Sequence, residues 1–282
     1  GFERNLERNL FRLESDLRCM KYDPGPMKVF VIRDPKTRVI SASVFRDRVV
    51  HHAICNVIEP IFEKSFIYDS YASRKRKGTH AALKRFDYFK RKVSQNGRTI
   101  KNSNNGNMVV GYVLKADIKH YFDTVDHAVL LAIIGNKIKD VKILSLIEKI
   151  VHNKSGKGMA IGNLTSQLFA NLYLNELDYF VKHNLRAKYY IRYLDDFVVL
   201  HKDKKVLEEW KNQIGEFLKT VLKLELHQQK SQIYTLSEGI NFLGFRIFYY
   251  YKLPKKSNLR LIEARIEEMQ RFYSEGLIGK EQ

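Results

Sequence analysis

The sequence predicts a mixed fold of the α/β or α+β class, and three observations support this prediction. Leucines recur at helical spacing in several stretches, for example between Leu6 and Leu17. Between these stretches lie short runs of β-branched and aromatic residues, which are typical of strands. Strand and helix patterns alternate along the chain around one acidic hairpin that carries Asp195-Asp196. Such alternation favours sheets covered by helices over an all-helical or all-β architecture.

The first hundred residues are expected to contain two helices and one hairpin. The expected elements are a helix over 6–17, strands over 27–32 and 38–40, and a helix over 44–64 that ends at Glu59-Pro60. Proline and glycine in Asp23-Pro24-Gly25-Pro26 stop the first helix. Residues 91–107 contain five Asn, two Gly, four basic residues and no acidic one, so we expect an exposed loop there.

The rest of the chain continues the alternation of strands and helices. Its expected elements are a β-rich segment over 109–122, a helix after Asp126-His127, a helix over 163–183, a hairpin over 189–200, a helix over 207–221, a strand pair over 241–253 and a helix over 259–269. Gly156, Gly158 and Gly162 mark a loop before the second of these helices. Helical spacing of apolar residues defines the helices, and β-branched or aromatic runs define the strands.

Composition limits the classes of function. The chain has 282 residues, with 50 Lys and Arg against 31 Asp and Glu, which gives a formal net charge of +19. A hydrophobic content of 44% excludes disorder of the whole chain, and no apolar run reaches the roughly 18 residues of a membrane span. The basic excess favours nucleic acid over an anionic membrane as partner. Cys19 and Cys55 lack the spacing of a zinc site and suit a reducing compartment.

The most informative segment is the expected hairpin, because Asp195 and Asp196 lie between two apolar runs. An Asp-Asp pair by itself is compatible with a polar hairpin turn. Flanking strands that look buried on both faces argue against that interpretation, since adjacent carboxylates repel each other unless a cation lies between them. Carboxylates at a hairpin tip are suitable ligands for Mg²⁺, which prefers oxygen and keeps positions open for phosphate.

Asp117 is a third candidate ligand, because it interrupts a strand-like run where an acidic residue is unexpected. The alternative is a carboxylate at an edge strand or turn. Two-metal catalysis requires carboxylates that bridge ions about 3.5–4 Å apart. Asp117, Asp195 and Asp196 meet this requirement if their strands are neighbours.

These residues, together with several others, resemble the ordered motifs of a reverse transcriptase. The matching segments are Asp69–Arg74 with Gly78–His80, Asp117–Phe122, Gly162–Gln167, Tyr193–Asp196 and Phe242–Phe245. A Tyr-x-Asp-Asp sequence alone is a weak signal, whereas several motifs in the family's order at sensible spacing are a strong one. The resemblance covers nearly the whole chain.

The motif that contains Gly162–Gln167 resembles most closely the same motif in reverse transcriptases of diversity-generating retroelements. In group II intron enzymes this motif usually begins with Gln-Gly and ends with Ser-Pro. This chain has Ile161-Gly162 and Ser166-Gln167 in these places. The resemblance therefore implies an error-prone enzyme that copies a template RNA into mutagenised cDNA.

The resemblance also implies a fold and a division into domains. The fold is a right-hand polymerase with fingers, a palm whose antiparallel sheet has helices on one face, and the start of a helical thumb. The expected domains are residues 1–110 for the N-terminal helix and fingers, 111–255 for the palm, and 256–282 for the start of the thumb. Because the chain begins in a helical pattern and shows one thumb helix, we expect a fragment.

By the same resemblance, individual residues receive catalytic roles. Two Mg²⁺ ions would be held at Asp117, Ile118, Asp195 and Asp196. Lys230 would protonate the departing pyrophosphate, and a solvated surface lysine is the alternative for this residue.

The remaining roles concern substrates. The residues implied to contact the incoming nucleotide are Arg74, Lys77, Phe122, Ile161, Gly162 and Gln167. The residues implied to grip the primer terminus are Phe242, Leu243 and Gly244. Phe122 would exclude a ribose 2′-hydroxyl, whereas Ile161 cannot hydrogen-bond to the nascent base pair. Simpler alternatives are a solvated basic face at 74–77, a core aromatic at 122 and an ordinary hydrophobic strand at 242–245.

The leading hypothesis is an RNA-directed DNA polymerase in the cytoplasm of a bacterium or encoded by a phage. Its partners would be template RNA, an RNA/DNA or RNA-primer duplex, dNTPs and a small basic accessory protein, without a membrane. One alternative is a group II intron-like or other bacterial reverse transcriptase. A catalytically silent RNA-binding scaffold is the alternative from a different class, and the retention of all three aspartates argues against it.

Overall fold

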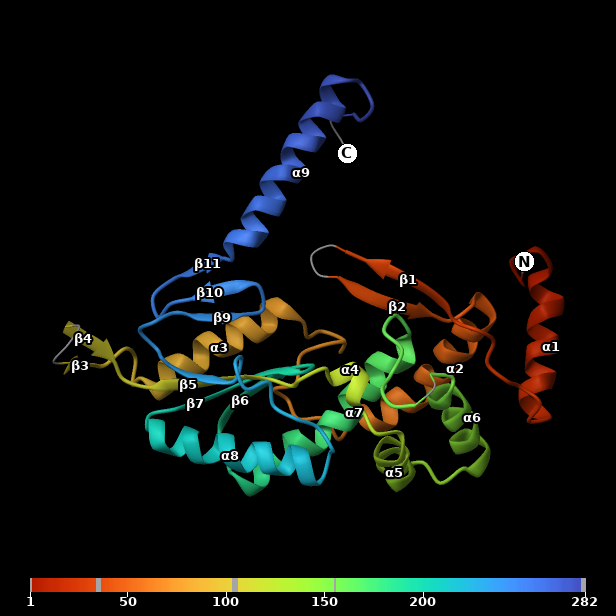
Figure 1. Cartoon of the computed structure of the whole chain (residues 1–282), viewed down its shortest axis with the longest axis horizontal. Coiled ribbons are helices and arrows are strands. Elements are labelled where there is room, and N and C mark those ends of the chain that lie inside the picture. The colour runs from red at the N-terminus through yellow and green to blue at the C-terminus, as the bar shows by residue number, and fades with distance from the viewer. Residues whose placement is uncertain (1, 34–36, 103–105, 155, 280–282) are drawn as a thin grey trace.

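A four-stranded antiparallel sheet lies at the centre of the computed structural model, which describes residues 2–33, 37–102, 106–154 and 156–279 (Figure 1). Its strands, in spatial order, are β6 (Tyr189–Tyr193), β7 (Asp196–His201), β5 (Tyr112–Asp117) and β8 (Gln232–Thr235). The predicted hairpin is present, and the predicted β-rich segment over 109–122 contains β5, which pairs with β7 of that hairpin. The sequence pattern does not predict β8, whose four residues are partly exposed and do not alternate clearly.

Helices cover both faces of this sheet, which corrects the expectation of helices on one face. The covering helices are α7 (Leu164–Tyr179) with the π-helical turn η2 (Phe180–Asn184), α8 (Lys204–Thr220) and α3 (Thr79–Val93). Val199 packs into the core with α7 and α8, whereas its neighbour Val198 packs into a second core with α3. Successive side chains of a strand point to opposite faces, so a strand that is apolar at both positions needs cover on both sides.

The N-terminal part surrounds one end of α7. Its elements are the 3-10 turn η1 (Phe2–Asn5), α1 (Leu6–Arg18), the hairpin β1 (Lys28–Ile32) and β2 (Arg38–Ala42), and α2 (Phe45–Glu63). Further along the chain, α5 (His127–Lys137) and α6 (Val141–His152) complete this part. The predicted helix over 44–64 is confirmed as α2, but its expected end at Glu59-Pro60 is wrong, because α2 continues through Pro60 to Glu63. Ile58 and Phe62 are buried on either side of the proline, so packing holds the last turn together.

Two segments differ from their expected form. The segment expected as a loop over 91–107 contains the end of α3 and the hairpin β3 (Thr99–Asn102) and β4 (Gly106–Val109), and residues 103–105 of it lie outside the described residues. The expected strand pair over 241–253 is a three-stranded sheet of β9 (Ile240–Phe242), β10 (Phe245–Ile247) and β11 (Lys252–Pro254). These strands are too short for periodicity to separate them from loops.

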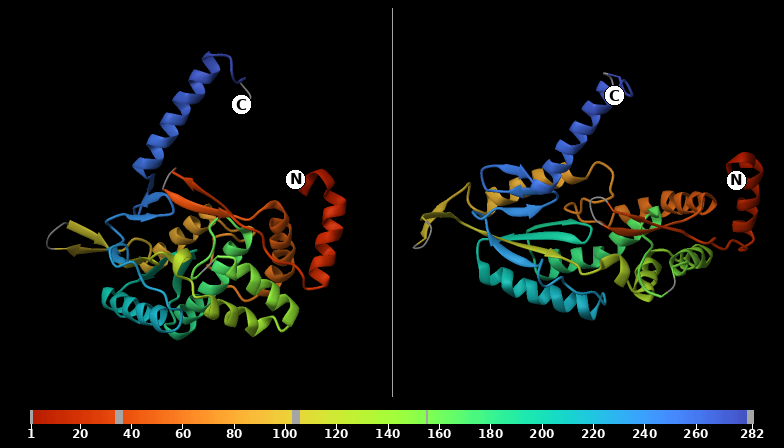
Figure 2. Two further views of the ribbon diagram at one scale, coloured as in Figure 1. Left: turned by 45° about the vertical axis from the view of Figure 1, so that its right-hand side comes forward. Right: turned by 45° about the horizontal axis from the view of Figure 1, so that its top comes forward.

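The C-terminal helix α9 (Lys256–Ser274) projects from the body of the molecule (Figure 2). The apolar residues that predict this helix are exposed, and they are Leu259, Ile262, Ile266 and Met269. The three-stranded sheet below it is tied to α3, because Lys252 pairs with Asp87 and the Lys90 ammonium donates to the Phe248 carbonyl at 3.1 Å. No helix among the described residues is both long and apolar enough to cross a membrane.

Candidate active site

The ends of β5 and β7 bring two of the three predicted carboxylates side by side. The Cα atoms of Asp117 and Asp196 are partners in the antiparallel register. Asp195 lies in the two-residue turn between β6 and β7, and its carbonyl accepts a hydrogen bond of 3.2 Å from the Ile118 amide. The other turn residue, Leu194, has a φ of +53°, a strained conformation of the kind that clusters at functional sites.

Burial and mutual repulsion raise the pKa values of Asp195 and Asp196. Burial, and next the charge of Asp117, raise the pKa of Asp195 to about 6. The pKa of Asp196 is also raised, chiefly by burial, although Lys115 at 3.3 Å from its Oδ1 opposes the shift. Lys230 donates to Asp117 Oδ2 at 2.9 Å, which places this lysine in the predicted site. The protein therefore holds three carboxylates together with only partial compensation of their charge.

The donor set fits divalent metal chemistry, although the side chains do not form a ready-made cage. Among the described residues, no group of three or more His, Cys, Asp and Glu side chains is placed to hold a metal ion as it stands. Lys230 and Lys115 contact two of the carboxylates in this arrangement. Asp196 Oδ1 is buried, and its contact with Lys115 is an ion pair that does not have the geometry of a hydrogen bond. A buried carboxylate oxygen without a hydrogen bond, in a cluster of like charges, is a suitable ligand for a hard cation.

A buried ion pair between Arg192 and Asp178, which the sequence pattern does not predict, supports the turn that contains Asp195. Arg192 is fully buried on β6 and makes two 2.7 Å hydrogen bonds to the two oxygens of Asp178 on α7. Its Nη1 also donates to Asn171 Oδ1 at 3.1 Å and to the Leu194 carbonyl at 3.4 Å. Burial alone would lower the pKa of Arg192, but Asp178 raises it above its ordinary value, so the guanidinium stays charged. Arg192 is thus a positioning residue for the acidic turn.

The basic run at 74–77 is more structural than expected. The side chain of Arg74 is only 6% exposed, and it binds both oxygens of Glu63 and the carbonyls of Ile67 and Ser70. Lys77 donates to the Tyr68 carbonyl at 2.8 Å. Burial, and next the charge of Arg74, lower the pKa of Lys77. In this arrangement Arg74 is committed to protein groups, so its predicted contact with a triphosphate would require those bonds to break.

The predicted nucleotide-binding residues at 161–167 lie between the basic run and the β1–β2 hairpin. Gln167, in the first turn of α7, accepts a 3.2 Å hydrogen bond from Ser73 Oγ. The Ile161 carbonyl accepts from the Ser41 amide at 2.9 Å. Gly162 has a φ of +118°, and a Cβ there would come within 2.8 Å of Ile40 Cγ2. Glycine is therefore required here for both backbone conformation and close packing.

Phe122 lies in the short helix α4 (Tyr121–Thr124), directly after the Asp117 strand. Its ring is half-buried against Tyr121, with ring centroids 5.4 Å apart. Its carbonyl accepts from the Met159 amide at 2.6 Å, which joins α4 to the loop that leads into 161–167. The partial exposure of Phe122 leaves both alternatives, a sugar contact and a core aromatic, compatible with its position.

Of the predicted primer-binding residues, only the turn is accessible. Phe242 is fully buried and packs on Phe86 with ring centroids 5.9 Å apart, so its side chain serves the core. Leu243 and Gly244 form the turn between β9 and β10, with φ values of +47° and +85°. Any contact with a primer would therefore come from this turn and not from the Phe242 side chain.

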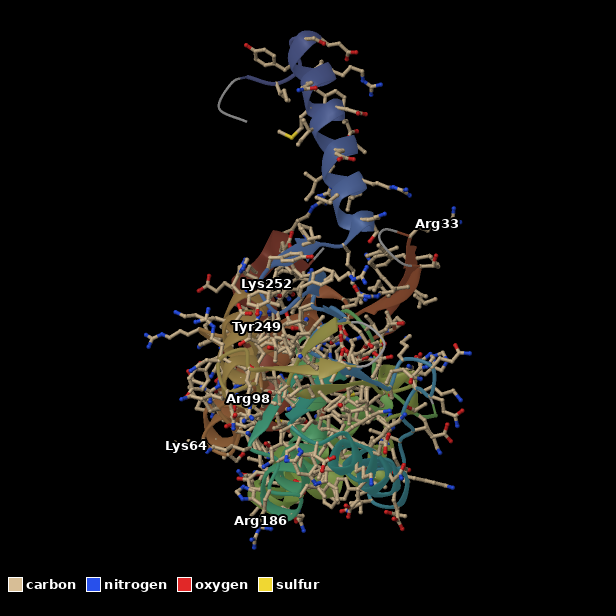
Figure 3. All side chains as sticks on the ribbon, turned by 90° about the vertical axis from the view of Figure 1, so that its left-hand side faces the viewer. Arg33, Lys64, Arg98, Arg186, Tyr249 and Lys252 are labelled. Carbon is tan, nitrogen blue, oxygen red and sulfur yellow. The ribbon has the colours of Figure 1, made fainter. Side chains whose placement is uncertain are left out.

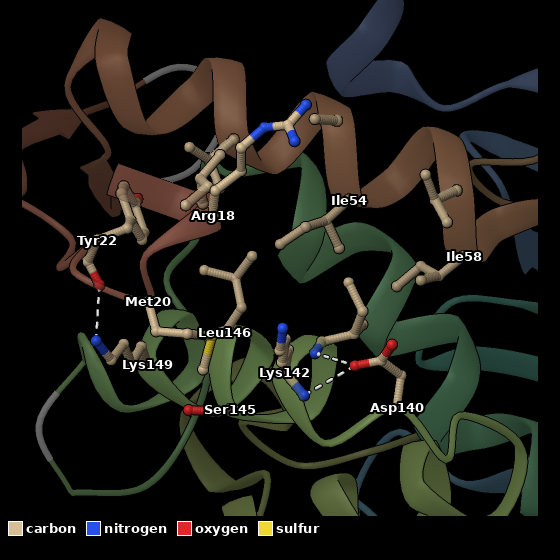
Figure 4. A pocket seen from close by; sticks show the side chains of 15 residues that line it. Arg18, Met20, Tyr22, Ile54, Ile58, Asp140, Lys142, Ser145, Leu146 and Lys149 are labelled. Atoms are coloured by element: carbon tan, nitrogen blue, oxygen red, sulfur yellow. Dashed lines mark hydrogen bonds between the residues drawn. The ribbon is translucent and has the colours of Figure 1, made fainter. Parts of the chain in front are cut away.

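A separate cavity of about 580 Å³ lies between α1, α2 and α6 (Figure 4). Its walls include Met20, Ile54 and Leu146, and Lys149 at its edge donates to the Tyr22 carbonyl at 2.8 Å. None of the predicted site residues lines it. The cavity is thus distinct from the carboxylate cluster.

Comparison with known proteins agrees with this geometry. Residues 32–247 match the family described as reverse transcriptase (RNA-dependent DNA polymerase), and the chain therefore belongs to this family. It is 26% identical to protein YkfC of Escherichia coli over 94% of its own length and 77% of that protein. It is also 26% identical to the group II intron-encoded protein LtrA of Lactococcus lactis, over 86% of this chain and 50% of LtrA. The chain thus spans about half the length of LtrA.

Solved structures show the same fold at low sequence identity. Apo telomerase from Candida tropicalis superposes with a TM-score of 0.61 at 15% identity, over 83% of this chain and 49% of that one. Telomerase from Candida albicans, in complex with a fragment of telomeric RNA, gives a TM-score of 0.60 at 10% identity, over 84% and 47%. These similarities confirm the expected right-hand polymerase fold.

Proposed function

We propose that this chain catalyses RNA-directed DNA synthesis, in which a primer 3′-hydroxyl attacks the α-phosphate of a dNTP. The observation that carries the proposal is the meeting of Asp117, Asp195 and Asp196 at the ends of neighbouring strands in a member of the reverse transcriptase family. The net charge of +19 supports binding of a template–primer duplex through its phosphates.

Reverse transcriptases generally depend on divalent metal ions, and we propose two Mg²⁺ ions here. Asp117, Asp195, Asp196 and Ile118 would hold them. Bound Mg²⁺ would activate the attacking hydroxyl and neutralise charge on the leaving pyrophosphate. In our proposal, Lys230 holds its proton on Nζ beside Asp117 and donates it to the pyrophosphate oxygen.

The other predicted residues would orient the substrates around this cluster. Phe122 would lie beneath the sugar, and Ile161, Gly162 and Gln167 beside the nascent base pair. Lys77, together with Arg74 once it leaves Glu63, would approach the triphosphate, and the 243–244 turn would hold the primer terminus. The division into an N-terminal helix and fingers (residues 1–110), a palm (111–255) and the start of a thumb (256–282) is also part of this proposal.

Primer extension with Mg²⁺, an RNA template and a DNA primer tests the proposal. Asp195→Asn and Asp117→Asn each remove a charge and keep shape, so extension should fall by about 10³-fold or more while RNA binding stays within about twofold. Asp123→Asn, an exposed carboxylate that pairs with Lys154, is the matched control and should extend normally. Extension at the wild-type rate by either site variant would overturn the assignment, and a wild-type chain that binds RNA without extension would favour the silent scaffold.

Within this activity, we infer the error-prone type found in diversity-generating retroelements. The inference is supported by the resemblance of the motif from Ile161 to Gln167 to those enzymes, and by Ile161 itself, because an apolar side chain cannot discriminate by hydrogen bonding. The partners implied are a structured template RNA and a small basic accessory protein, in a bacterial or phage-infected cytoplasm. Sequencing of cDNA from an RNA of known sequence should show errors concentrated opposite template adenine, a base preference that only the family resemblance implies, and Ile161→Gln should reduce the error rate. Accurate copying at adenines by the parent chain would contradict this type.

A group II intron-like reverse transcriptase is the second candidate, and the similarity to LtrA favours it. That enzyme class would show uniform, low error over all four template bases in the same sequencing experiment. Fidelity therefore separates the two types, whereas primer extension alone does not.

A further inference from the structure

The outer side of α3 and the loop before it carry a large part of the positive charge of the molecule. Residues 64–110 contain twelve Lys and Arg and only two acidic residues. Asp69 is buried and pairs with Arg85 at 2.7 Å, and Asp87 pairs with Lys90 at 2.8 Å. Both carboxylates are thus neutralised within the protein, and the exposed charge of this segment is entirely positive.

Cations and exposed tyrosines alternate along this surface, which we call the α3 ladder: Lys77, Tyr68, Arg85, Tyr88 and Lys92. Tyr68 is 67% exposed, with Lys77 Nζ 3.5 Å and Arg85 Cζ 5.1 Å from its ring centroid. Tyr88 is 49% exposed, with Arg85 Cζ at 5.3 Å and Lys92 Nζ at 5.5 Å. The cations fix the rings while most of the Tyr68 surface and half of Tyr88 stay open to solvent.

The α3 ladder extends away from the carboxylate cluster toward the C-terminal end of α3. Thr79, at the start of α3, contacts the hydroxyl of Tyr193 beside the acidic turn, whereas Phe89, next to Tyr88, packs on Tyr189 at the opposite end of β6. In Figure 3, Lys64, the first residue of the basic segment 64–110, lies on the left edge of the body, and Arg33 of the β1–β2 hairpin lies on the right. Substrates held at the carboxylates, with Lys77 at the triphosphate, would leave the end of the ladder from Arg85 to Lys92 free.

We propose that the α3 ladder is a second RNA-binding surface that holds a single-stranded segment of RNA outside the catalytic cleft. Lysines and arginines would contact successive phosphates, and bases would stack on the exposed tyrosine surface. An acidic peptide would use the cations but has no bases to place on the rings, and a duplex shields its base faces. The identity of this RNA as template rests on the proposed function, whereas the binding surface does not.

The test is binding of a labelled 20-nucleotide single-stranded RNA to the whole chain in the presence of saturating unlabelled primer–template duplex. The ladder variant combines Tyr88→Ala and Lys92→Ala with Lys84→Ala, four residues before Tyr88 on the same face, and all three positions are exposed on α3. The matched control removes the same residue types elsewhere, through Tyr179→Ala, Lys205→Ala and Lys219→Ala, which are also exposed. We expect the ladder variant to weaken binding at least about tenfold and to lower the salt slope by about 1.4, with the control unchanged.

Stacking is separated from charge by two single variants. Tyr88→Phe keeps the ring and should bind like the wild type, whereas Tyr88→Leu should weaken binding about fivefold or more with the salt slope unchanged. Equal loss in the ladder and control variants, or full binding by Tyr88→Leu, would overturn the proposal, the second outcome indicating a purely electrostatic patch. Extension on a short template should be normal in the ladder variant. A wild-type chain that fails to extend but binds RNA through the ladder would contradict the proposed function alone.

Discussion

Two carboxylate environments that both contact the β6–β7 hairpin differ in how completely the protein satisfies them. Asp178 is fully buried, and it accepts two 2.7 Å bonds from Arg192 and one of 2.8 Å from the Tyr190 hydroxyl. At the tip of the same hairpin, Asp195 and Asp196 have raised pKa values, and Asp196 Oδ1 makes an ion pair with Lys115 but no hydrogen bond among the described atoms. The β6–β7 hairpin thus contacts one saturated acidic centre, Asp178 on α7, and carries one unsaturated centre, Asp195 with Asp196.

This difference separates charge that maintains the fold from charge reserved for chemistry. A buried carboxylate with a bidentate arginine needs nothing from outside the protein. Carboxylates that repel each other while only lysines compensate them are costly until a stronger cation arrives. The saturated centre positions the turn, and the unsaturated centre at the turn would receive the metal in the proposed function. Opposite responses to neutralising substitutions should therefore distinguish the two centres.

The largest effect on stability is expected at the saturated centre. Arg192→Met leaves Asp178 buried without its partner, so the free energy of unfolding should fall by about 3–5 kcal/mol. Urea denaturation followed by circular dichroism measures this loss. The double variant Arg192→Met with Asp178→Leu removes both charges and should recover most of it. A loss below about 1 kcal/mol in the single variant would remove Arg192 from its supporting role.

The unsaturated centre should respond in the opposite direction. The folded-state pKa of Asp195, about 6, lies above its ordinary 3.8, so the folded protein binds this proton more tightly than the unfolded chain. Stability therefore falls as the pH rises between these values, and it stays reduced above them. Asp195→Asn should raise stability at pH 7.5 without Mg²⁺ by about 3 kcal/mol, since the pKa is raised from 3.8 to about 6 and one pKa unit corresponds to about 1.4 kcal/mol.

Mg²⁺ should stabilise the protein through the unsaturated centre and not through the saturated one. It should raise the melting temperature of the wild type more at pH 7.5 than at pH 5, because a protonated carboxyl is a poor ligand. Asp195→Asn should lose most of this stabilisation, whereas the control Asp123→Asn should keep it. Equal melting curves for wild type and Asp195→Asn at both pH values would mean that the two centres do not differ as described.

Arg74 and Glu63 form an intermediate case, saturated but at the surface. The Glu63 side chain is 40% exposed, so water can solvate it when its partner is lost. Arg74→Ala should therefore cost only about 1.5–3 kcal/mol, less than Arg192→Met. Lys75→Ala, at an exposed neighbour, is the control. A normal unfolding curve together with a raised KM for dNTP would instead support the predicted triphosphate contact.

The sequence indicates the unsaturated centre more readily than the saturated one. Asp117, Asp195 and Asp196 interrupt apolar strands, and this contrast is visible without a structure. Arg192 also interrupts an apolar strand, but its partner Asp178 lies in a helix, and no spacing rule connects the two. The sequence of the basic run does not show whether Arg74 is packed or exposed, because the burial of its side chain depends on contacts with Glu63 and Phe66.

A similar limit applies to the fold. Long elements with a regular pattern of apolar residues, such as α1, α8 and the β6–β7 hairpin, could be predicted because the pattern repeats over many residues. The short strands β3, β4 and β8 are polar or partly exposed, and their pairing depends on neighbours far along the chain. Helix α2 continues through Pro60 because tertiary packing outweighs local propensity.

The smallest effect is expected where neither acidic centre is touched. The Phe122 ring is half-buried beside Tyr121, so Phe122→Ala should leave the pH dependence of stability unchanged. If the ring lies beneath the sugar, its removal should shift the preference for dGTP over rGTP by roughly tenfold, or about 1.4 kcal/mol, the size expected for a steric contact. Single-nucleotide extension with each substrate measures the ratio, with Phe122→Tyr as the control that keeps the ring. An unchanged ratio in Phe122→Ala, together with lower stability, would assign the ring to the core. In that case deoxyribose would be selected over ribose only by the way in which the carboxylates position the substrate. The unsaturated centre would then determine sugar specificity as well as catalysis.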